Sequence, residues 1–269
     1  MIRRIITAVA ILSLSAASYA QELTILHVND THSHIDPQRT GEYIGMGGVI
    51  EQAAYIDSVR LADGRRNVLL LHAGDYGQGT SYFTELDGNI EIDVMNTLGF
   101  DVVCLGNHEF DNGTEELARR LSNLKAQVVC ANYDFSDTPL EGLVKPYVVV
   151  RKAGKKIGII GLLTDIRKVV DKEIAAKFKY QDPVEVTERM AAFLKDEKGC
   201  DLVMCLSHLG YMEDKELASM VHDLDLIVGG HTHTLLHKLQ KVKNLDGDDT
   251  VVVQNWKWGL NVGELKVEF

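Results

Sequence analysis

Short runs of apolar, mostly β-branched residues recur along the chain, and segments with helical features separate them. We expect six of these runs to be strands, at residues 23–28, 68–72, 101–105, 127–131, 201–206 and 225–228. We expect helices between them at about 48–62, 90–98, 115–124, 184–197 and 214–222. Alternation of strands and helices in this order is typical of an α/β sheet that is covered by helices.

Other apolar runs indicate a second, partly antiparallel sheet. A hairpin is predicted from strands at 146–152 and 156–163, which Ala153-Gly154 joins, and a further strand pair is predicted at 250–254 and 262–268. The chain has only four prolines, and neither an internal repeat nor a low-complexity segment marks a linker. We therefore expect residues 21–269 to form one domain.

The first twenty residues have the pattern of a secretory signal peptide. Arg3 and Arg4 precede an apolar stretch at 5–17, and Ser18-Tyr19-Ala20 forms a small-x-small cleavage site. The alternative is a membrane anchor, but this stretch is shorter than the roughly 20 residues that a spanning helix needs. We therefore predict cleavage after Ala20 and a periplasmic or secreted protein without a membrane anchor.

The charge balance argues against nucleic acid as a partner. The chain has 28 Lys and Arg against 39 Asp and Glu, a formal net charge of −11, and no basic stripe offsets it locally.

Of the four cysteines, Cys200 and Cys205 flank a predicted strand and lie too far apart for a disulfide. Cys104 and Cys130 fall in two similar strands, and their disulfide state stays open, with buried thiols as the favoured interpretation.

Side chains that can bind metal follow five of the predicted strands. Because the carboxyl ends of strands form the ligand crevice of an open α/β sheet, we expect these side chains to converge. Each of them is, by itself, also a common turn or cap residue. The seven candidate metal ligands are Asp30, His32, Asp75, Asn107, His208, His231 and His233.

These ligands offer carboxylate oxygen, amide oxygen and imidazole nitrogen. This mixture favours Zn²⁺, Mn²⁺, Fe or Co²⁺ over Ca²⁺. Seven ligands are too many for one tetrahedral ion, so we predict two divalent metal ions that share a carboxylate. Two pairs, Asp30 with His32 and His231 with His233, are spaced by two residues. In an extended segment such residues project to the same side, so each pair is expected to hold one cation.

Five motifs in order along the chain carry a resemblance to a known family: HVNDTHSH, HAGDYGQG, LGNHEFDNG, LSHLG and VGGHTHT. With them, the chain resembles the metallophosphoesterase (calcineurin-like) domain of the 5′-nucleotidases and UDP-sugar hydrolases. The resemblance implies an αββα fold, in which two sheets form a sandwich with helices on both outer faces. It further implies that Asp30, His32, Asp75 and His233 hold one metal, that Asp75, Asn107, His208 and His231 hold the other, and that His108 and Asp111 form a catalytic dyad.

The resemblance also implies a function. It indicates a secreted phosphohydrolase that acts on nucleoside 5′-phosphates or related small phosphoesters through a metal-bound hydroxide. A phosphodiesterase or pyrophosphatase for cyclic nucleotides or nucleotide sugars is an alternative, and so is a non-enzymatic binding or assembly subunit. Family members commonly continue into a second, substrate-binding domain that this sequence does not contain. One half of a two-chain 5′-nucleotidase, with a separate substrate-binding chain, is therefore another alternative.

Five further histidines are expected to lie outside the site. His27 and His72 fall within strands just before predicted ligands, which suggests core histidines, with a hydrogen bond to the ligand loops as the alternative. His34, His222 and His237 are expected at the solvated surface.

Overall fold

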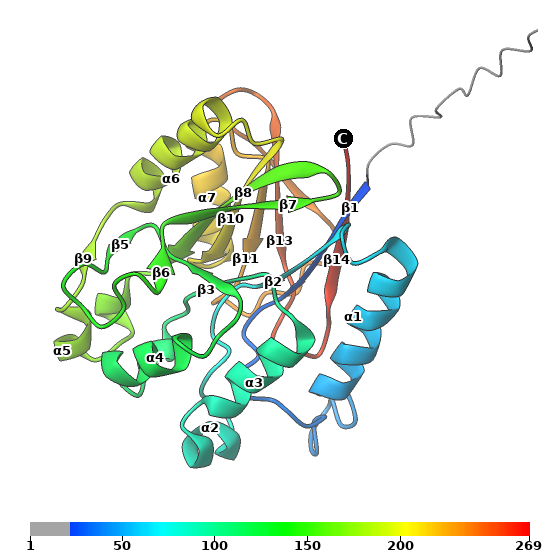
Figure 1. Ribbon diagram of the computed structural model, residues 1–269, viewed down its shortest axis with the longest axis vertical. Coiled ribbons are helices and arrows are strands. Elements are labelled where there is room, and N and C mark those ends of the chain that lie inside the picture. Colours follow the sequence, from blue (N-terminus) through cyan, green and yellow to red (C-terminus); the bar gives the residue numbers. More distant parts are fainter. Residues whose placement is uncertain (1–21) are drawn as a thin grey trace, which may run out of the picture.

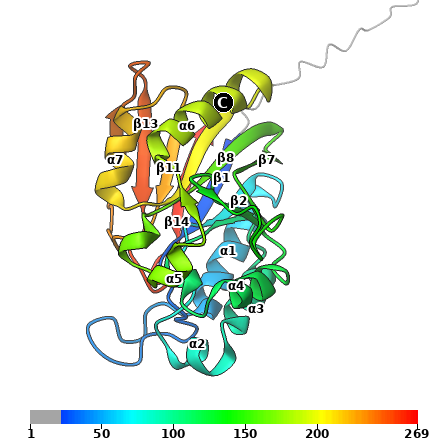
Figure 2. The ribbon, with the colours of Figure 1, turned by 90° about the vertical axis from the view of Figure 1, so that its left-hand side faces the viewer.

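The computed structural model describes residues 22–269, so the predicted signal peptide at 1–20 lies outside the described residues. Two six-stranded sheets pack face to face, and helices cover the outer face of each (Figures 1 and 2). The predicted αββα fold class is thereby confirmed. Within residues 22–269, no helix has both the length and the apolar character needed to cross a membrane.

The first sheet has the strand order β14-β1-β2-β3-β4-β6. Its neighbouring strands run parallel, except that β14 pairs antiparallel with β1. The bounds are β1 Glu22–Val28, β2 Val68–His72, β3 Val102–Cys104, β4 Gln127–Val129, β6 Val144–Lys145 and β14 Gly263–Glu268.

The second sheet has the order β12-β13-β11-β10-β8-β7, with antiparallel pairs only at its two edges. The predicted hairpin is confirmed as β7 with β8. The bounds are β7 Tyr147–Lys152, β8 Lys155–Leu163, β10 Leu202–His208, β11 Leu226–Gly229, β12 Gln240–Lys243 and β13 Asp249–Gln254. A separate short pair joins β5 Tyr133–Asp134 to β9 Lys179–Tyr180.

The helices divide between the two outer faces (Figure 2). The first sheet is covered by α1 Val49–Asp63, α3 Asn89–Leu98 and α4 Thr114–Leu121, with α2 Ser81–Leu86 beside α3. The second sheet is covered by α6 Pro183–Ala192, which continues as a π-helix at Phe193–Glu197, and by α7 Tyr211–Ser219. Short helical turns at α5 Lys172–Ala175, His108–Phe110 and Ile166–Lys168 complete the described secondary structure.

Alternate residues of the central strands enter different cores. In β1, Leu23 and Ile25 point into the layer between the sheets, whereas Leu26 and Val28 pack under the helices of the first sheet. Both faces of these strands are therefore buried, which explains why they are continuous apolar runs and do not alternate with polar residues.

One predicted strand pairing is wrong. The strands at 250–254 and 262–268 exist as β13 and β14, but they belong to different sheets. β13 lies parallel to β11, whereas β14 closes the edge of the first sheet against β1. Segment 255–262 crosses between the sheets, and pairing partners so distant in sequence leave no local pattern. The short strands β5, β6, β9 and β12 and the helices α2 and α5 were not predicted. All four cysteines are buried and free in the described structure.

The two sheets approach each other closely at Gly161 of β8, where Ala131 N donates to Gly161 O at 2.7 Å. A Cβ at this position would lie 2.2 Å from the carbonyl carbon of Val129. Backbone atoms on both sides leave no flexible group that could move away. The small size of Gly161 therefore sets the separation of the sheets at this point.

We predict that Gly161→Ala destabilises the fold by at least about 1–3 kcal/mol, because it overpacks the contact between the sheets. The matched control is Gly158→Ala on the same strand, whose added Cβ meets chiefly the tip of the Leu194 side chain at 2.9 Å. Urea unfolding monitored by circular dichroism measures both variants. Equal losses of unfolding free energy would contradict the inter-sheet explanation.

Candidate metal centre

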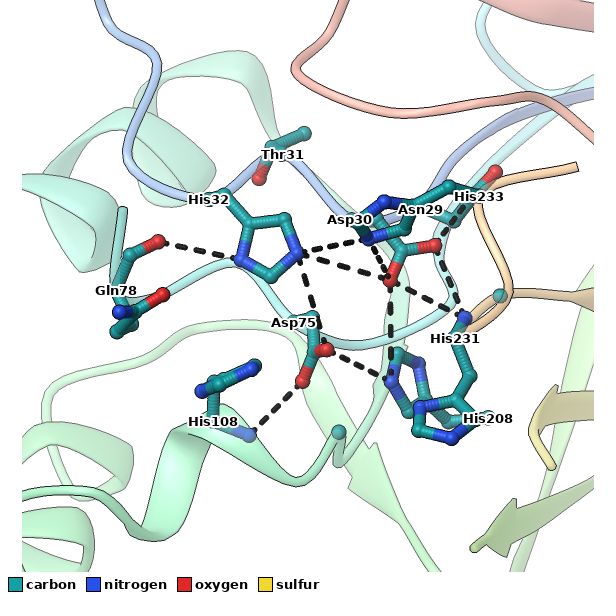
Figure 3. A network of polar contacts seen from close by, with 12 residues as sticks. Asn29, Asp30, Thr31, His32, Asp75, Gln78, His108, His208, His231 and His233 are labelled. Atoms are coloured by element: carbon teal, nitrogen blue, oxygen red, sulfur yellow. Dashed lines mark hydrogen bonds and ion pairs between the residues drawn. The ribbon is translucent and has the colours of Figure 1, made fainter. Parts of the chain in front are cut away.

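The seven predicted metal ligands come together where the carboxyl ends of five strands meet. The loops after β1, β2 and β3 supply side chains from the first sheet, and β10 and β11 supply them from the second. Figure 3 shows most of these side chains around the carboxylates of Asp30 and Asp75. The site therefore lies at the seam of the two sheets, and neither sheet could form it alone.

The potential ligands form two groups. Each group offers three donor atoms that lie within 4.8 Å of one another: Asp30, His32 and His233 in the first, and Asp75, His208 and His231 in the second. Asp75 reaches toward both groups. Its Oδ2 lies 3.0 Å from His208 Nε2 and 3.9 Å from His32 Nε2. A shared carboxylate between two cation sites is the arrangement that these distances favour.

The expectation that each i, i+2 pair would hold one cation is wrong for His231 and His233, which lie in different groups. The loops are not extended, so the two-residue rule does not apply to them. Their backbone is left-handed at five of the seven ligands, with φ of 50° at Asp30, 46° at His32, 53° at Asp75, 73° at His231 and 50° at His233. Non-glycine residues rarely adopt this conformation, and it gathers at functional sites whose surroundings enforce it.

Hydrogen bonds between the loops enforce this backbone. Asp30 N donates to Gly74 O at 3.0 Å, and His231 N donates to the Asp30 carboxylate at 3.0 Å. His108 N donates to Asp75 Oδ1 at 2.9 Å (Figure 3). The ligand loops therefore stabilise one another, and the position of each carboxylate depends on strands from both sheets.

Glu109 is an organising residue that the sequence analysis did not identify. Its carboxylate is fully buried and accepts backbone N–H groups from Asp75 at 2.9 Å, Tyr76 at 3.0 Å, Gly77 at 3.1 Å and Gly106 at 2.5 Å. Burial, together with the charge of Asp75, raises the pKa of Glu109 to about 7. The signal that the sequence offered is the place of this acidic residue inside the LGNHEFDNG motif, two residues after the predicted ligand Asn107.

The donor chemistry fits divalent cations. His208 Nδ1 donates to Ala73 O at 2.6 Å and His32 Nδ1 donates to Gln78 O at 3.2 Å, so that Nε2 carries the lone pair when each ring is neutral. Metal-binding histidines are commonly oriented in this way. His32 Nε2 lies 3.0 Å from His233 Nε2, a contact that needs a cation or a shared proton.

Asn107 supports the same conclusion. Its Oδ1 is buried and has no hydrogen-bond partner among residues 22–269, which is costly unless the oxygen binds a ligand.

The charges of Asp75 and His208 also stabilise each other. Burial by itself would raise the pKa of the Asp75 carboxyl and lower the pKa of the His208 imidazole. Their mutual attraction outweighs burial, so the pKa of the carboxyl is lowered and that of the imidazole is raised. The centre therefore favours positive charge between its carboxylates.

His108 and Asp111 lie together beside the two groups. The His108 Nδ1 and Asp111 Oδ2 atoms are 2.8 Å apart, and this hydrogen bond is the main cause that raises the pKa of His108 to about 9. His108 belongs to neither donor group, but it lines the same cavity of about 410 Å³ as His32, Asp75 and His231. His108 of the predicted dyad is thus placed where it can contact a bound ligand, and Asp111 lies behind it as its hydrogen-bond partner.

The remaining histidines differ in part from expectation. His72 Nε2 lies 3.0 Å from Thr31 Oγ1, so it supports the loop that carries Asp30 and His32. His27 is a core residue, although its Nδ1 has no partner within the described chain. His34 is not a solvated surface residue, because its ring stacks on Trp258 and lines the cavity of the metal centre.

Comparison with known proteins agrees with this site. The calcineurin-like phosphoesterase family matches residues 23–235, and the chain belongs to that family. The predicted class, a metal-dependent phosphoric ester hydrolase with similarity to 5′-nucleotidases, is thereby confirmed.

Several relatives align with nearly all of the chain. It is 36% identical to an NAD 5′-nucleotidase of Haemophilus influenzae over 94% of its own length, and 34% identical to a snake venom 5′-nucleotidase of Naja atra over 92%. The crystal structure of a 5′-nucleotidase precursor from Thermus thermophilus superposes with a TM-score of 0.86 at 40% identity, over 92% of this chain. The chain spans about half the length of each relative. It covers 45% of the Haemophilus influenzae protein, 50% of the Naja atra protein and 51% of the Thermus thermophilus protein.

We predict that Glu109→Gln weakens divalent-cation binding by about 10- to 100-fold, because its carboxylate positions the loop of Asp75. It should also lower the unfolding free energy by about 1–3 kcal/mol, since buried N–H groups lose a charged acceptor. Glu116→Gln on the exposed face of α4 is the control. Isothermal titration with Mn²⁺ and thermal unfolding test both effects. Unchanged Mn²⁺ affinity would show that Glu109 does not position the ligands.

Proposed function

We propose that this protein is a phosphohydrolase that holds two divalent cations and acts on nucleoside 5′-phosphates or related small phosphoesters. The observation that carries this proposal is the position of Asp75 between two donor groups at a cavity that His108 also lines. Such a cavity lies in the size range of small-molecule sites.

The two groups define the proposed ligands. Asp30, His32 and His233 would hold one cation, His208, His231 and Asn107 would hold the other, and both would share the carboxylate of Asp75. Zn²⁺, Mn²⁺, Fe and Co²⁺ suit this mixture of nitrogen and oxygen donors. When bound, such a pair supplies an activated water and offsets the charge of the phosphoryl oxygens.

His108 and Asp111 supply the proposed acid chemistry. Asp111 accepts the hydrogen bond of His108 Nδ1, so it fixes the orientation of the ring and leaves Nε2 for the substrate. We propose that His108 stabilises the charge that develops on the phosphoryl group or protonates the leaving oxygen. Its adjacency to Asn107 keeps it close to the cations without being a ligand.

The names of the relatives support a nucleotide as the substrate, because they include an NAD 5′-nucleotidase and a snake venom 5′-nucleotidase. An alternative that we retain is one half of a two-chain 5′-nucleotidase, in which a separate chain binds the substrate. A phosphodiesterase or pyrophosphatase activity is the other alternative, since the same donor groups suit both reactions. We also propose that residues 1–20 direct residues 21–269, as one domain, to the periplasm or the exterior.

Asp75→Asn is expected to reduce bound metal from both sites to at most one, because the bridging carboxylate loses its charge. Elemental analysis after dialysis against Mn²⁺ or Zn²⁺ measures the metal content per chain. Asp249→Asn on β13, far from the centre, is the control. A variant that keeps both metals would contradict the role of Asp75 as a bridge.

For His108→Ala we expect both metals to remain bound and turnover to fall by about 10²- to 10⁴-fold, the usual effect of losing a general acid or base. Hydrolysis of 4-nitrophenyl phosphate, with metal analysis on the same sample, separates these two readouts. Turnover equal to that of the unaltered chain would disprove the assignment.

The substrate is tested with the metal-loaded chain on AMP, bis(4-nitrophenyl) phosphate, a cyclic nucleotide and a UDP-sugar in parallel, each with and without EDTA. Metal-dependent hydrolysis of AMP above the others is the expected result. Preference for the diester or the UDP-sugar would favour the alternative activity. Inactivity on all of them with both metals bound would favour a missing partner chain.

A further inference from the structure

A pair of stacked aromatic rings stands at the rim of the metal centre. The imidazole of His34 and the indole of Trp258 have centroids 4.8 Å apart and an interplanar angle of 20°. Both residues line the cavity that His32, Asp75 and His108 also line. The two rings come from opposite ends of the chain, and neither is a predicted ligand or a member of the dyad.

The pair is held by the same loop that carries the first cation's ligands. Trp258 N donates to Asp30 O at 2.7 Å, and His34 Nδ1 donates to His32 O at 2.8 Å. The position of both rings relative to Asp30 and His32 is therefore fixed by short backbone connections. A ligand that contacts the rings and the cations at the same time would meet a preorganised site.

The backbone at Trp258 is unusual for a large residue. Its φ is 59°, in the left-handed region that bulky side chains rarely adopt. Trp256 has a φ of 60°, but it packs edge-to-face against Tyr43 and does not line the cavity. The loop thus carries two tryptophans in the same conformation, of which only Trp258 faces the metal centre.

The positively charged side chain of Lys257 lies beside the aromatic pair. Lys257 Nζ is 4.1 Å from the centroid of the Trp258 indole. Within residues 22–269, no carboxylate pairs with this ammonium, although the protein is acidic overall. The ammonium covers part of the indole, so a planar ring that stacks on Trp258 would replace it there, and the displaced positive charge would suit an anion that carries such a ring.

We propose that Trp258 and His34 form a stacking platform for the nucleobase of the substrate, while the phosphate lies at the donor groups for the cations. This proposal deepens the proposed function and rests on it, since it places the base-recognition surface within this chain. Stacking accepts every base because each has a π face, so the platform favours nucleotides over phosphoesters without a ring and does not select one base.

The two tryptophans of the chain allow a direct optical test. Trp256→Phe leaves Trp258 as the only indole, and Trp258→Phe leaves Trp256. The probe is a phosphonate analogue of AMP whose C–P bond resists hydrolysis, with methylphosphonate as the probe that lacks a base. We expect the analogue to quench the emission of the Trp256→Phe protein in a saturable manner and to leave that of the Trp258→Phe protein unchanged. Quenching of Trp256 alone, or of neither, would overturn the proposal.

Kinetics give the second readout. For Trp258→Ala, KM for AMP should rise roughly 5- to 100-fold, the usual loss for one stacked base. KM for ribose 5-phosphate and kcat for both substrates should change by less than about twofold if only stacking is lost. Trp258→Phe should restore the KM for AMP, and Trp256→Ala should leave it unaltered. Equal rises in KM for AMP and ribose 5-phosphate would overturn the platform.

The two tests separate this proposal from the proposed function. Quenching of Trp258 by the analogue in a chain that hydrolyses nothing would retain the platform and reject the phosphohydrolase activity. Hydrolysis of AMP with no quenching and no change in KM would retain the activity and reject the platform.

Discussion

The structure depends on one buried negative charge, the carboxylate of Asp75. It enters from the first sheet and lies 3.0 Å from the imidazole of His208, which belongs to the second. A buried charge is tolerated only where partners surround it, and those partners come from both sheets. Packing of the sheets and assembly of the centre are therefore one event, because the nearest imidazole partner of Asp75, His208, comes from the opposite sheet.

The same constraint explains the conformation of the loops. Five of the seven ligands adopt a left-handed backbone, which each loop would avoid in isolation. Glu109 stabilises the left-handed backbone of the Asp75 loop, since its carboxylate accepts hydrogen bonds from backbone N–H groups of the loops after β2 and β3. Gly106 permits the approach of these loops, because a Cβ there would lie 2.2 Å from Asp75 Oδ1. The rigidity that places the ligands also places the rings of His34 and Trp258.

Most residues of the metal centre could be predicted because the sequence signals that mark them come from near neighbours along the chain. A ligand such as Asp30 or His208 lies at or just after an apolar strand, and strand ends are recognisable from a few neighbouring residues. The parallel arrangement then brings those ends together. Glu109 was missed because its role consists of bonds to backbone groups, which have no residue-type signature. His34 was placed at the surface because its partner, Trp258, is more than 200 residues away in sequence.

The sequence by itself therefore determined most of the longer strands, the class of fold, the seven candidate ligands and the chemistry that their donors favour, since each depends on neighbouring residues. Only the tertiary structure decided that β14 joins β1, that His231 and His233 face different donor groups, and that an aromatic pair borders the cavity. The physical reason is the same in each case. These relations arise where distant segments meet across the seam of two sheets, and loop conformation there is set by the partners that the loops encounter.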